Sequence, residues 1–472
     1  MSRFLIAAAA AVSLAGCTLE PAYVRPTSSV PSAWPVGPAY PPASGEALPS
    51  LSYRDTFKDP HLQSVIEQAL ARNQDLRAAM ANVEVARAQY GAQRAAQFPQ
   101  LNANGTASVA QSEPATTAAG AGSNGAGMGR VTTRAYQADL SISAFELDLF
   151  GRLRSLSHAA QQQYLASEAG ARAARLTLIA EVANAYLVLA ADNSLLTIAR
   201  QTETSAGRTV QLTTARLEGG VAPRTDLTQA QTVLEQARSD NAQLTTNLAQ
   251  DRNLLELLVG DTVPDADIPA SIEGVDGLLA EAPAGLDSRI LLRRPDVVEA
   301  EYGLRAANAR IGAARAAFFP TISLTTLAGF ASPQLSSLFN GRNFAWQAQG
   351  AATQSIFDGG ANISNLRLAK AQRDVAVAQY QKAIQTAFRE VADALARRGT
   401  MSRQLDAQTA LERAAAQNFT LSEARYRQGI DPYLNTLDAQ RTLYAARQTL
   451  ASTRLARAQN LVALYQGLAG DQ

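Results

Sequence analysis

The sequence predicts an α+β membrane protein in which two repeats each contain long coiled-coil helices and two β-strands. Two blocks of sequence recur in the same order in both halves of the 472-residue chain. Apolar residues also recur at heptad spacing in long helical stretches, and four segments alternate between apolar and polar residues. Each alternating segment has about ten residues or a few more, the length that a tilted strand needs to cross a bilayer.

The internal repeat consists of a helix end and a turn. The segment 91–99 reappears as 312–320, and both segments end in Phe-Pro. The turn with Gly220 and a proline three residues later reappears at Gly429. Two alanine-rich helices could share their alanines by chance, but not both of these stops in the same order.

Long helices are predicted on both sides of each turn. The first half has helical stretches at 60–97, 153–217 and 224–259, and a further helix at 295–317 opens the second half. In the third stretch, apolar residues alternate at spacings of three and four, which predicts a coiled-coil seam with two polar interruptions. At about 1.5 Å per residue the stretches are roughly 50 to 100 Å long, so we expect them to pack lengthwise.

Four strands are predicted, at about 101–111, 132–144, 320–331 and 344–357. A half-buried sheet in a soluble protein would show the same alternation. No run of 18 apolar residues occurs in the chain, so we expect it to cross a membrane as strands and not as a helix.

A four-stranded sheet in lipid cannot leave its two edges unpaired, so the strands must close into a barrel with strands from other copies. Two copies would supply eight strands, a size usually filled by its own side chains. Three copies would supply twelve strands and a wider lumen.

The N-terminus predicts a lipid anchor. Residues 1–16 have the features of a lipoprotein signal peptide, which ends immediately before Cys17. Cys17 is the only cysteine, so it can carry a lipid but no intramolecular disulfide. An ordinary signal peptide with an incidental cysteine is the alternative. The proline-rich segment 17–58 predicts an extended strap, with plain disorder as its alternative.

The predicted organisation is therefore modular. It comprises a signal peptide (1–16), an anchor and strap (17–58), repeat 1 (59–262, turn 217–226), a connector (263–294) and repeat 2 (295–472, turn 426–435).

Nothing in the sequence predicts an enzyme, a metal site or a nucleic-acid partner. The chain has 42 basic and 41 acidic residues, so no general attraction to nucleic acid is expected. His61 and His158 are its only histidines and lack ligand spacing. The glycine-rich run 120–129 lies between two strands, which favours an external loop over a phosphate-binding loop. We expect no cofactor other than a covalent lipid on Cys17.

Six motifs together resemble the TolC-like outer-membrane factors, specifically the OprM/NodT-type efflux lipoproteins. They are Gly16-Cys17-Thr18-Leu19-Glu20-Pro21, Phe57-Lys58-Asp59-Pro60, Asp75-Leu76-Arg77, Glu146-Leu147-Asp148-Leu149-Phe150-Gly151, Arg293-Arg294-Pro295-Asp296 and Phe357-Asp358-Gly359-Gly360.

The resemblance implies a homotrimer whose 12-stranded β-barrel in the outer membrane of a Gram-negative bacterium continues into a 12-helix periplasmic α-barrel, with the segment 263–294 as an equatorial connector. It also implies a passive exit duct for small molecules or drugs. A periplasmic adaptor and an inner-membrane pump of RND type deliver these molecules to the duct. No catalysis is implied.

The resemblance makes the two turns the sites where the adaptor docks. The residues concerned are Gly219, Gly220, Pro223, Arg425, Gly429 and Pro432. Glycine suits a left-handed backbone position at a helix end, and proline suits a first helical turn. Any helical hairpin uses such residues, so the turn chemistry alone does not identify a docking site.

The resemblance also implies a periplasmic gate of carboxylate rings just after the second turn. The matching positions are Asn435 and Asp438; Asp431 could supply the charge that Asn435 lacks, and Arg425 or Arg427 could pair with neighbouring helices. A solvated helix carboxylate is the alternative for Asp438. For Asp226, the counterpart of Asn435 in the first repeat, we expect the role of an N-terminal helix carboxylate.

Two other functions remain as alternatives. A protein-secretion duct of the same family would share the fold, although a lipid anchor favours efflux. A coiled-coil scaffold lipoprotein would keep the anchor and the heptads but has no need for four strands of bilayer-crossing length.

Overall fold

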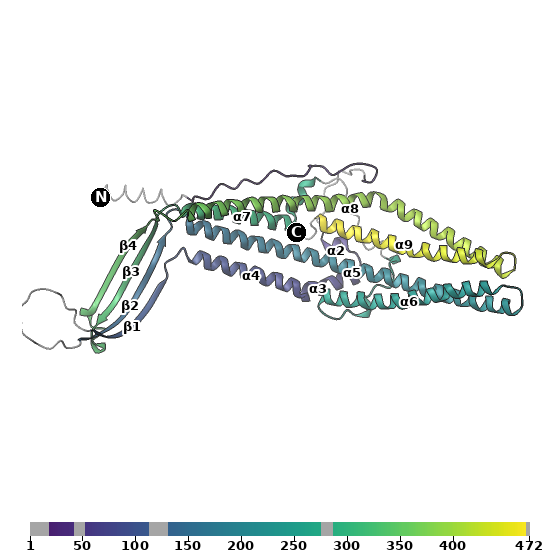
Figure 1. Cartoon of the computed structure of the whole chain (residues 1–472), viewed down its shortest axis with the longest axis horizontal. Coiled ribbons are helices and arrows are strands. Elements are labelled where there is room, and N and C mark those ends of the chain that lie inside the picture. The colour runs from purple at the N-terminus through teal and green to yellow at the C-terminus, as the bar shows by residue number, and fades with distance from the viewer. Residues whose placement is uncertain (1–17, 42–51, 113–130, 275–286, 469–472) are drawn as a thin grey trace, which may run out of the picture. The chain divides into compact units, whose positions relative to one another are not determined.

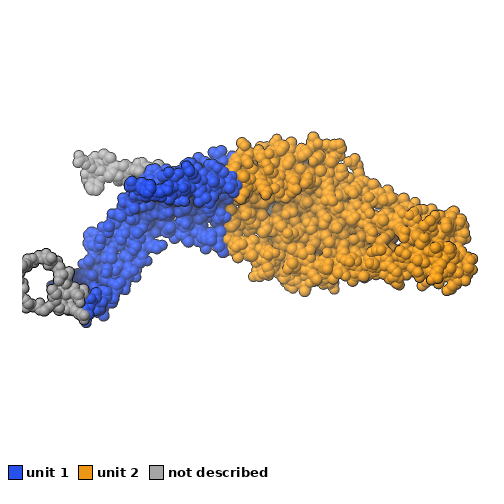
Figure 2. Space-filling model, viewed as in Figure 1, with its two compact units in different colours: residues 1–25, 85–164, 302–376 blue, residues 26–84, 165–301, 377–472 orange. Residues whose placement is uncertain are grey.

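A computed structural model describes residues 18–41, 52–112, 131–274 and 287–468. They fall into two compact units (Figure 2). Unit 1 comprises residues 1–25, 85–164 and 302–376, and unit 2 comprises residues 26–84, 165–301 and 377–472. Cys17, the signal peptide and the glycine-rich run 120–129 lie outside the described residues.

Unit 1 contains a four-stranded antiparallel sheet with the order β1-β2-β3-β4 (Figure 1). The strands are β1 (Leu101–Ser112), β2 (Val131–Leu147), β3 (Thr321–Ser332) and β4 (Phe344–Thr353). The first repeat supplies β1 and β2 and the second supplies β3 and β4, so the β2–β3 pairing joins the repeats. The prediction of two strands in each repeat is confirmed.

The strand ends differ from the prediction in two places. β2 extends to Leu147 because a bulge at Ala144 carries the strand on after the register shifts. Ala144 has a φ of 50°, and its N–H donates to Thr325 Oγ1 at 3.1 Å. β4 ends at Thr353, four residues earlier than predicted.

The helices account for most of the described chain. They are α2 (Tyr53–Thr56), α3 (Pro60–Arg72), α4 (Gln74–Ala95), α5 (Arg152–Glu218), α6 (Arg224–Val259), α7 (Pro295–Ala316), α8 (Ala361–Arg427) and α9 (Tyr433–Gly467). Short 3-10 turns are η1 (Asp265–Asp267), η3 (Ser288–Arg293), η4 (Leu335–Ser337) and η5 (Gly341–Asn343). The repeat-related helices α5 and α8 each have 67 residues, or about 100 Å of helix.

Within the described residues, α5 alone is long and apolar enough to match a membrane-spanning helix. Its most apolar 18-residue window has a mean hydropathy of 1.4, and 61% of that window is buried. Such burial is typical of the core helix of a folded protein. We therefore interpret this window as part of the core and not as a membrane-spanning helix.

The prediction of one helix over 60–97 is wrong, because Asn73 divides it into α3 and α4. The Asn73 N–H closes α3 on the Ala69 carbonyl at 2.8 Å, and its side chain accepts a hydrogen bond from the Leu76 N–H at 2.8 Å. Its Nδ2 donates to the Leu258 carbonyl at 2.9 Å. Asparagine at a helix start satisfies otherwise unpaired backbone groups, so the break is stabilised locally.

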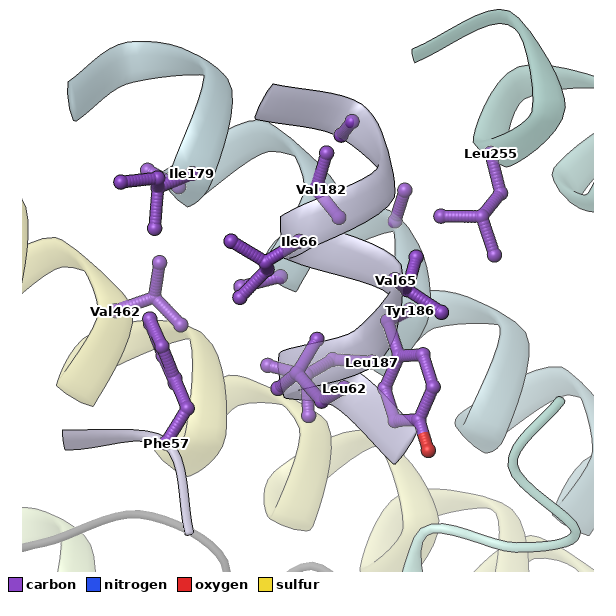
Figure 3. Close-up of a cluster of buried hydrophobic side chains, with 14 of the residues drawn as sticks. Phe57, Leu62, Val65, Ile66, Ile179, Val182, Tyr186, Leu187, Leu255 and Val462 are labelled. Carbon is purple, nitrogen blue, oxygen red and sulfur yellow. The ribbon is translucent and has the colours of Figure 1, made fainter. Parts of the chain in front are cut away.

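The core of unit 2 surrounds α3 (Figure 3). Its labelled side chains are Phe57, Leu62, Val65, Ile66, Ile179, Val182, Tyr186, Leu187, Leu255 and Val462. They come from the segment before α3, from α3 itself and from α5, α6 and α9. The Tyr186 hydroxyl donates to Asp59, the N-cap of α3, at 2.8 Å. The apolar face of α3 therefore holds together helices from both repeats.

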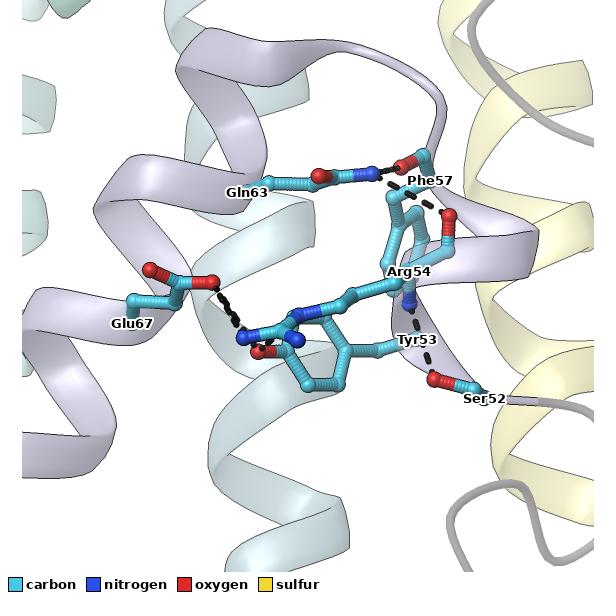
Figure 4. Close-up of polar contacts among 6 residues, drawn as sticks. All are labelled: Ser52, Tyr53, Arg54, Phe57, Gln63 and Glu67. Atoms are coloured by element: carbon cyan, nitrogen blue, oxygen red, sulfur yellow. Dashed lines mark hydrogen bonds and ion pairs between the residues drawn. The ribbon is translucent and has the colours of Figure 1, made fainter.

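The end of the predicted strap, 17–58, is not extended. Residues 53–56 form α2, which Ser52 caps, and Phe57 is fully buried. An ion pair of 2.7 Å joins Arg54 to Glu67, and Gln63 donates to the Phe57 carbonyl (Figure 4). The ring of Phe57 packs in the core against Tyr465 of α9, with the ring centroids 5.2 Å apart.

The described part of the strap, 18–41, has no helix or strand and is held by side chains. In unit 1, Asn308 Nδ2 donates to the Pro21 carbonyl at 2.7 Å. In unit 2, Trp34 stacks on Phe388 with ring centroids 5.0 Å apart. These contacts contradict plain disorder for this part of the strap.

Candidate functional site

The two helical hairpin turns, predicted as docking sites, have the same backbone geometry. Residues 219–221 donate three hydrogen bonds to residues 215–217, at 2.9 to 3.0 Å. Residues 428–430 donate the same three to residues 424–426, at 2.9 to 3.1 Å. The repeat in sequence is therefore a repeat in structure.

Glycine is required once in each turn. Gly220 has a φ of 70° and Gly429 a φ of 75°, and both end a helix in the left-handed region. Pro223 and Pro432 stand one position earlier than we expected, as the N-caps of α6 and α9.

The second turn contains an internal ion pair. Arg425 donates to both carboxylate oxygens of Asp431, at 2.6 and 3.0 Å, which holds the pKa of Asp431 below its usual range. Arg427 pairs with Glu423 at 2.7 Å, one helical turn away. Both arginines that we expected to pair with neighbouring helices thus pair within their own hairpin.

Arg216, the counterpart of Arg425, instead reaches from the first hairpin to the second. Its Nη1 donates to the Tyr426 carbonyl at 2.9 Å, and its guanidinium lies 4.7 Å from the centre of the Tyr426 ring. Tyr426 in turn packs on Tyr433 at 5.3 Å. The sequence analysis did not single out these residues. One feature of the sequence could have indicated them: position 222, the counterpart of Asp431, has no acid with which Arg216 could form the ion pair of the second turn.

The expected gate positions lie together at the start of α9. Asn435 and Asp438 are exposed, whereas Thr436 and Leu437 between them are buried. Asn435 hydrogen bonds to Asp431, which lowers the pKa of Asp431 further. An amide at position 435 therefore avoids repulsion with the carboxylate of the turn.

Asp226 occupies the first turn of α6, as predicted. Burial raises the pKa of its carboxyl, and the charge of Arg216 acts in the opposite direction. Asp226 therefore lies at the contact between the two hairpins and is not one of the exposed residues, Asn435 and Asp438, of α9.

Aromatic side chains mark both ends of β3 in unit 1. Phe319, just before the strand, stacks on Phe150 with centroids 4.7 Å apart. Near the other end, Phe330 contacts Phe339 and Phe344, each at 5.6 Å. Aromatic rings at both ends of membrane strands are typical where a barrel meets the two bilayer interfaces.

Residues 65–261 and 286–470 match the family model described as outer membrane efflux protein. The chain belongs to this family. Members are channels of efflux pumps and not enzymes, and they lie in the outer membrane with a periplasmic part. The resemblance inferred from the six sequence motifs is confirmed.

Three similar proteins illustrate the match. The antibiotic efflux pump outer membrane protein ArpC and the toluene efflux pump outer membrane protein TtgC, both from Pseudomonas putida, are each 44% identical over 473 residues, covering 100% of this chain and 96% of the relative. The open-state MtrE channel of Neisseria gonorrhoeae superposes with a TM-score of 0.84 at 34% identity, covering 96% of this chain and 98% of that one.

This efflux protein also contains an acid pair that the sequence analysis did not single out. Asp251 of α6 lies against Asp192 of α5. Burial and then the charge of Asp192 raise the pKa of Asp251 to about 6, and burial raises that of Asp192. Asn247 hydrogen bonds to Asp192.

The variant Asp251→Asn is expected to be more thermostable than wild type at pH 7.5, by about 1 kcal/mol after allowance for solvent screening. A raised carboxyl pKa favours the protonated folded state, so wild type gains stability as the pH falls through 6, and the variant does not. Melting curves between pH 7.5 and 5 measure this. Asp406→Asn, at an exposed α8 position, should keep the wild-type slope; an equal slope in Asp251→Asn would contradict the pairing.

Proposed function

We propose that three copies of this chain form a passive exit duct of a tripartite efflux system, which carries small molecules across the outer membrane. The observation that carries the proposal is the open sheet of unit 1. In the described residues, β1 and β4 each pair with one strand only, and aromatic rings flank β3 at both ends. A sheet of this length can sit in lipid only if other copies pair with its edges, and three copies give a twelve-stranded barrel.

The long hairpins are suited to a periplasmic tunnel. With two hairpins in each chain, a trimer has twelve hairpin helices. Its six hairpin turns are of two closely similar kinds. We propose that a periplasmic adaptor docks there, on Gly219, Gly220 and Pro223 of the first turn and on Gly429 and Pro432 of the second. Arg425 keeps the second turn in shape through Asp431. Transport energy would come from an inner-membrane pump, of RND type.

The lipid anchor remains part of the proposal. The strap makes specific contacts immediately after Cys17: the Thr18 and Ser155 hydroxyl oxygens lie 3.4 Å apart, and Arg315 donates to the Leu19 carbonyl at 3.1 Å. An acylated Cys17 would therefore be followed directly by a strap segment that contacts unit 1 from Thr18 onward. We propose no other cofactor.

Small molecules are the proposed cargo. The names of ArpC and TtgC refer to antibiotic and toluene efflux. The same relatives argue against a protein-secretion duct, and the sheet argues against a non-transporting scaffold.

The gate is proposed at Asp438, with Asp431 and Asn435 beside it and Arg427 supporting the turn. Three exposed carboxylates in a narrow lumen would attract cations and repel one another. We expect the purified wild-type protein to be trimeric in detergent and to give small, cation-preferring currents in planar bilayers. Asp438→Ala should lose selectivity or conduct several-fold more.

Asp406→Ala, which removes an exposed carboxylate of α8, is the control and should conduct like wild type. Unchanged currents in Asp438→Ala would place the gate elsewhere. A monomer without currents would overturn the duct and favour the scaffold.

A further inference from the structure

The edge strand β4 of unit 1 stops short of the apolar residues that follow it. β4 ends at Thr353, and the backbone N–H groups of residues 354–357 form no hydrogen bond to another backbone group among the described residues. Ile356 and Phe357 are each 90% exposed. At the other edge of the sheet, Leu101 at the start of β1 is 67% exposed (Figure 1). The two edges therefore present apolar side chains at the same end of the sheet.

β2 shows what a partner strand does at this end. Beyond Ile142 it has no partner in β1, whose first residue is Leu101, and it continues to Leu147 through pairing with β3 alone. β4 is in the same position beyond Thr353, which pairs with Thr321, the first residue of β3. Among the described residues, however, no strand lies on the other side of β4. A single chain therefore offers nothing that could extend β4.

The repeat relates the two edges to a pairing that the chain already makes. β1 is equivalent to β3 and β2 to β4, so the ladder between β2 and β3 is the internal counterpart of a ladder between β4 of one copy and β1 of the next. Because residues 91–99 recur as 312–320, Leu101 is equivalent to Ile322. The register of β2 on β3 therefore predicts the register of β4 on β1 of a partner subunit.

The helices that follow β2 and β4 complete the equivalence. Counting back from the starts of α5 and α8, which both have 67 residues, makes Leu147 equivalent to Ile356. Leu147 lies opposite Ile322 in the β2–β3 ladder. The equivalent pair is Ile356 and Leu101 of the partner subunit. These are two of the apolar residues that the single chain leaves exposed.

A second count, from the other side of the bulge in β2, gives the same register. The β1–β2 and β3–β4 ladders make Ile142 equivalent to Ala352. Ile142 pairs with Thr326, whose equivalent in β1 is Gly105. Ala352 would then lie opposite Gly105 of the partner subunit, and from there to Ile356 both strands advance by the same number of residues. The ladder between copies is therefore continuous, without the bulge that interrupts β2.

The alternation of side chains supports this register independently. Residues directly opposite each other in an antiparallel pair lie on the same face of the sheet. The apolar side of β1 consists of the odd-numbered positions 101–109, and that of β4 of the even-numbered positions 344–352. The register from the repeat pairs odd with even positions, so the two apolar sides coincide. A slip by one residue would set the apolar side of one strand beside the polar side of the other.

We propose that assembly extends β4 to Ile356 by pairing with β1 of a partner subunit, in the register that sets Ile356 opposite Leu101 and Ala352 opposite Gly105. This inference rests on the proposed trimeric duct and specifies how its subunits join. The pairing satisfies backbone groups of residues 354–356 that would cost several kcal/mol each if left unpaired in lipid. It also accounts for the sequence prediction of a strand that reaches residue 357.

Cross-linking of the full-length protein tests the register. In the double variant Asn102→Cys/Ser355→Cys, the two thiols lie directly opposite each other in the proposed ladder, on its polar side. Within one chain the two positions are at opposite edges of the sheet, three strand spacings or about 14 Å apart, which no disulfide can bridge. Mild oxidation of the detergent-purified trimer should therefore convert most of the protein to covalent trimer on denaturing gels without reductant.

The double variant Asn102→Cys/Thr353→Cys is the matched control. Thr353 lies on the same face of β4 as Ser355, two residues away, so its thiol would be diagonal to that at position 102. Diagonal Cα atoms are about 7 to 8 Å apart, beyond the range of a disulfide. We expect at least about tenfold less covalent trimer from this pair. Every variant keeps Cys17, so Ser355→Cys alone reports the background.

Hydrogen exchange of the wild-type trimer tests the extension of β4 without any substitution. Residues 145–147 of β2 are the internal reference, because they are the counterparts of residues 354–356 and pair on one side only. We expect both segments to exchange at similar rates, at least about tenfold more slowly than unpaired amides. If a cysteine pair prevents trimer formation, this measurement decides.

The outcomes separate this inference from the duct. Covalent trimer from the control pair instead of the test pair would overturn the register. Residues 354–356 that exchange as fast as unpaired amides in a wild-type trimer would overturn the extension of β4. Both results would leave the trimeric duct intact. A wild-type monomer in detergent would overturn the duct, and the pairing with it.

Discussion

The variant Gly329→Val is expected to abolish assembly of the channel in the outer membrane. Gly329 lies opposite Asp139 in the central β2–β3 pairing. A Cβ at position 329 would come within 2.4 Å of the Ala138 carbonyl oxygen and 2.5 Å of Asp139 atoms. Backbone atoms cannot move aside without breaking the ladder, and a broken ladder in lipid leaves unpaired N–H and C=O groups that cost several kcal/mol each.

Gly350→Val is the matched control. Gly350 lies in β4, opposite Leu324 of β3, and an added Cβ there meets nothing within 4 Å. Both variants place the same β-branched residue in the same sheet. We expect the control to reach the outer-membrane fraction as trimer on unheated gels, and Gly329→Val to be degraded or retained as monomer. Normal trimer from Gly329→Val would contradict the close β2–β3 approach.

The features that the sequence predicted are those encoded locally. Heptad spacing, alternation and a Gly-x-x-Pro turn each depend on residues a few positions apart, and the structure has long helices, four strands and two matching turns in those places. The repeat added the long-range information, because two similar halves must use equivalent elements in equivalent ways.

The features that the sequence did not predict depend on partners far apart in the chain. In the sequence, Asn73 lies within a continuous helical pattern. Its hydrogen bond to the Leu258 carbonyl at the end of α6 becomes evident only in the structure. In the sequence, Arg216 is equivalent to Arg425. Position 222 has no acid with which Arg216 could pair, and in the structure Arg216 donates to the Tyr426 carbonyl instead. Equivalent residues in the two repeats thus serve different contacts, which periodicity alone cannot distinguish.

The Arg293-Arg294-Pro295-Asp296 motif shows the same limit, since it was quoted for the resemblance without a physical role. In unit 2, Arg294 is buried and donates to both carboxylate oxygens of Asp296, at 3.1 and 2.8 Å. It also donates to Glu390 of α8 at 2.9 Å and to the Gly467 carbonyl, at the end of α9, at 3.4 Å. One guanidinium therefore joins the start of α7 to two helices of the second hairpin.

Truncation of this arginine, in Arg294→Ala, is expected to lower the stability of the protein by about 2 to 4 kcal/mol, at the lower end of what breaking a buried ion pair costs. The loss is moderated because the side chains of Asp296 and Glu390 are 43% and 44% exposed and can be hydrated. It remains large because a buried cavity replaces the guanidinium and the last turn of α9 loses a cation at its carbonyl end. Melting temperature and protease resistance of the purified protein measure the loss.

Arg289→Ala is the control for this prediction. Among the described residues, the exposed side chain of Arg289 forms an ion pair with the nearby Asp287, and an exposed pair of this kind contributes little to stability, so the variant should melt close to wild type. Arg294→Lys separates charge from geometry: a lysine keeps the positive charge but cannot bond Asp296 through two nitrogens and reach Glu390 at the same time. We expect it to recover less than half of the loss. Wild-type stability in Arg294→Ala would mean that packing alone, and not this cation, holds α7 to the ends of α8 and α9.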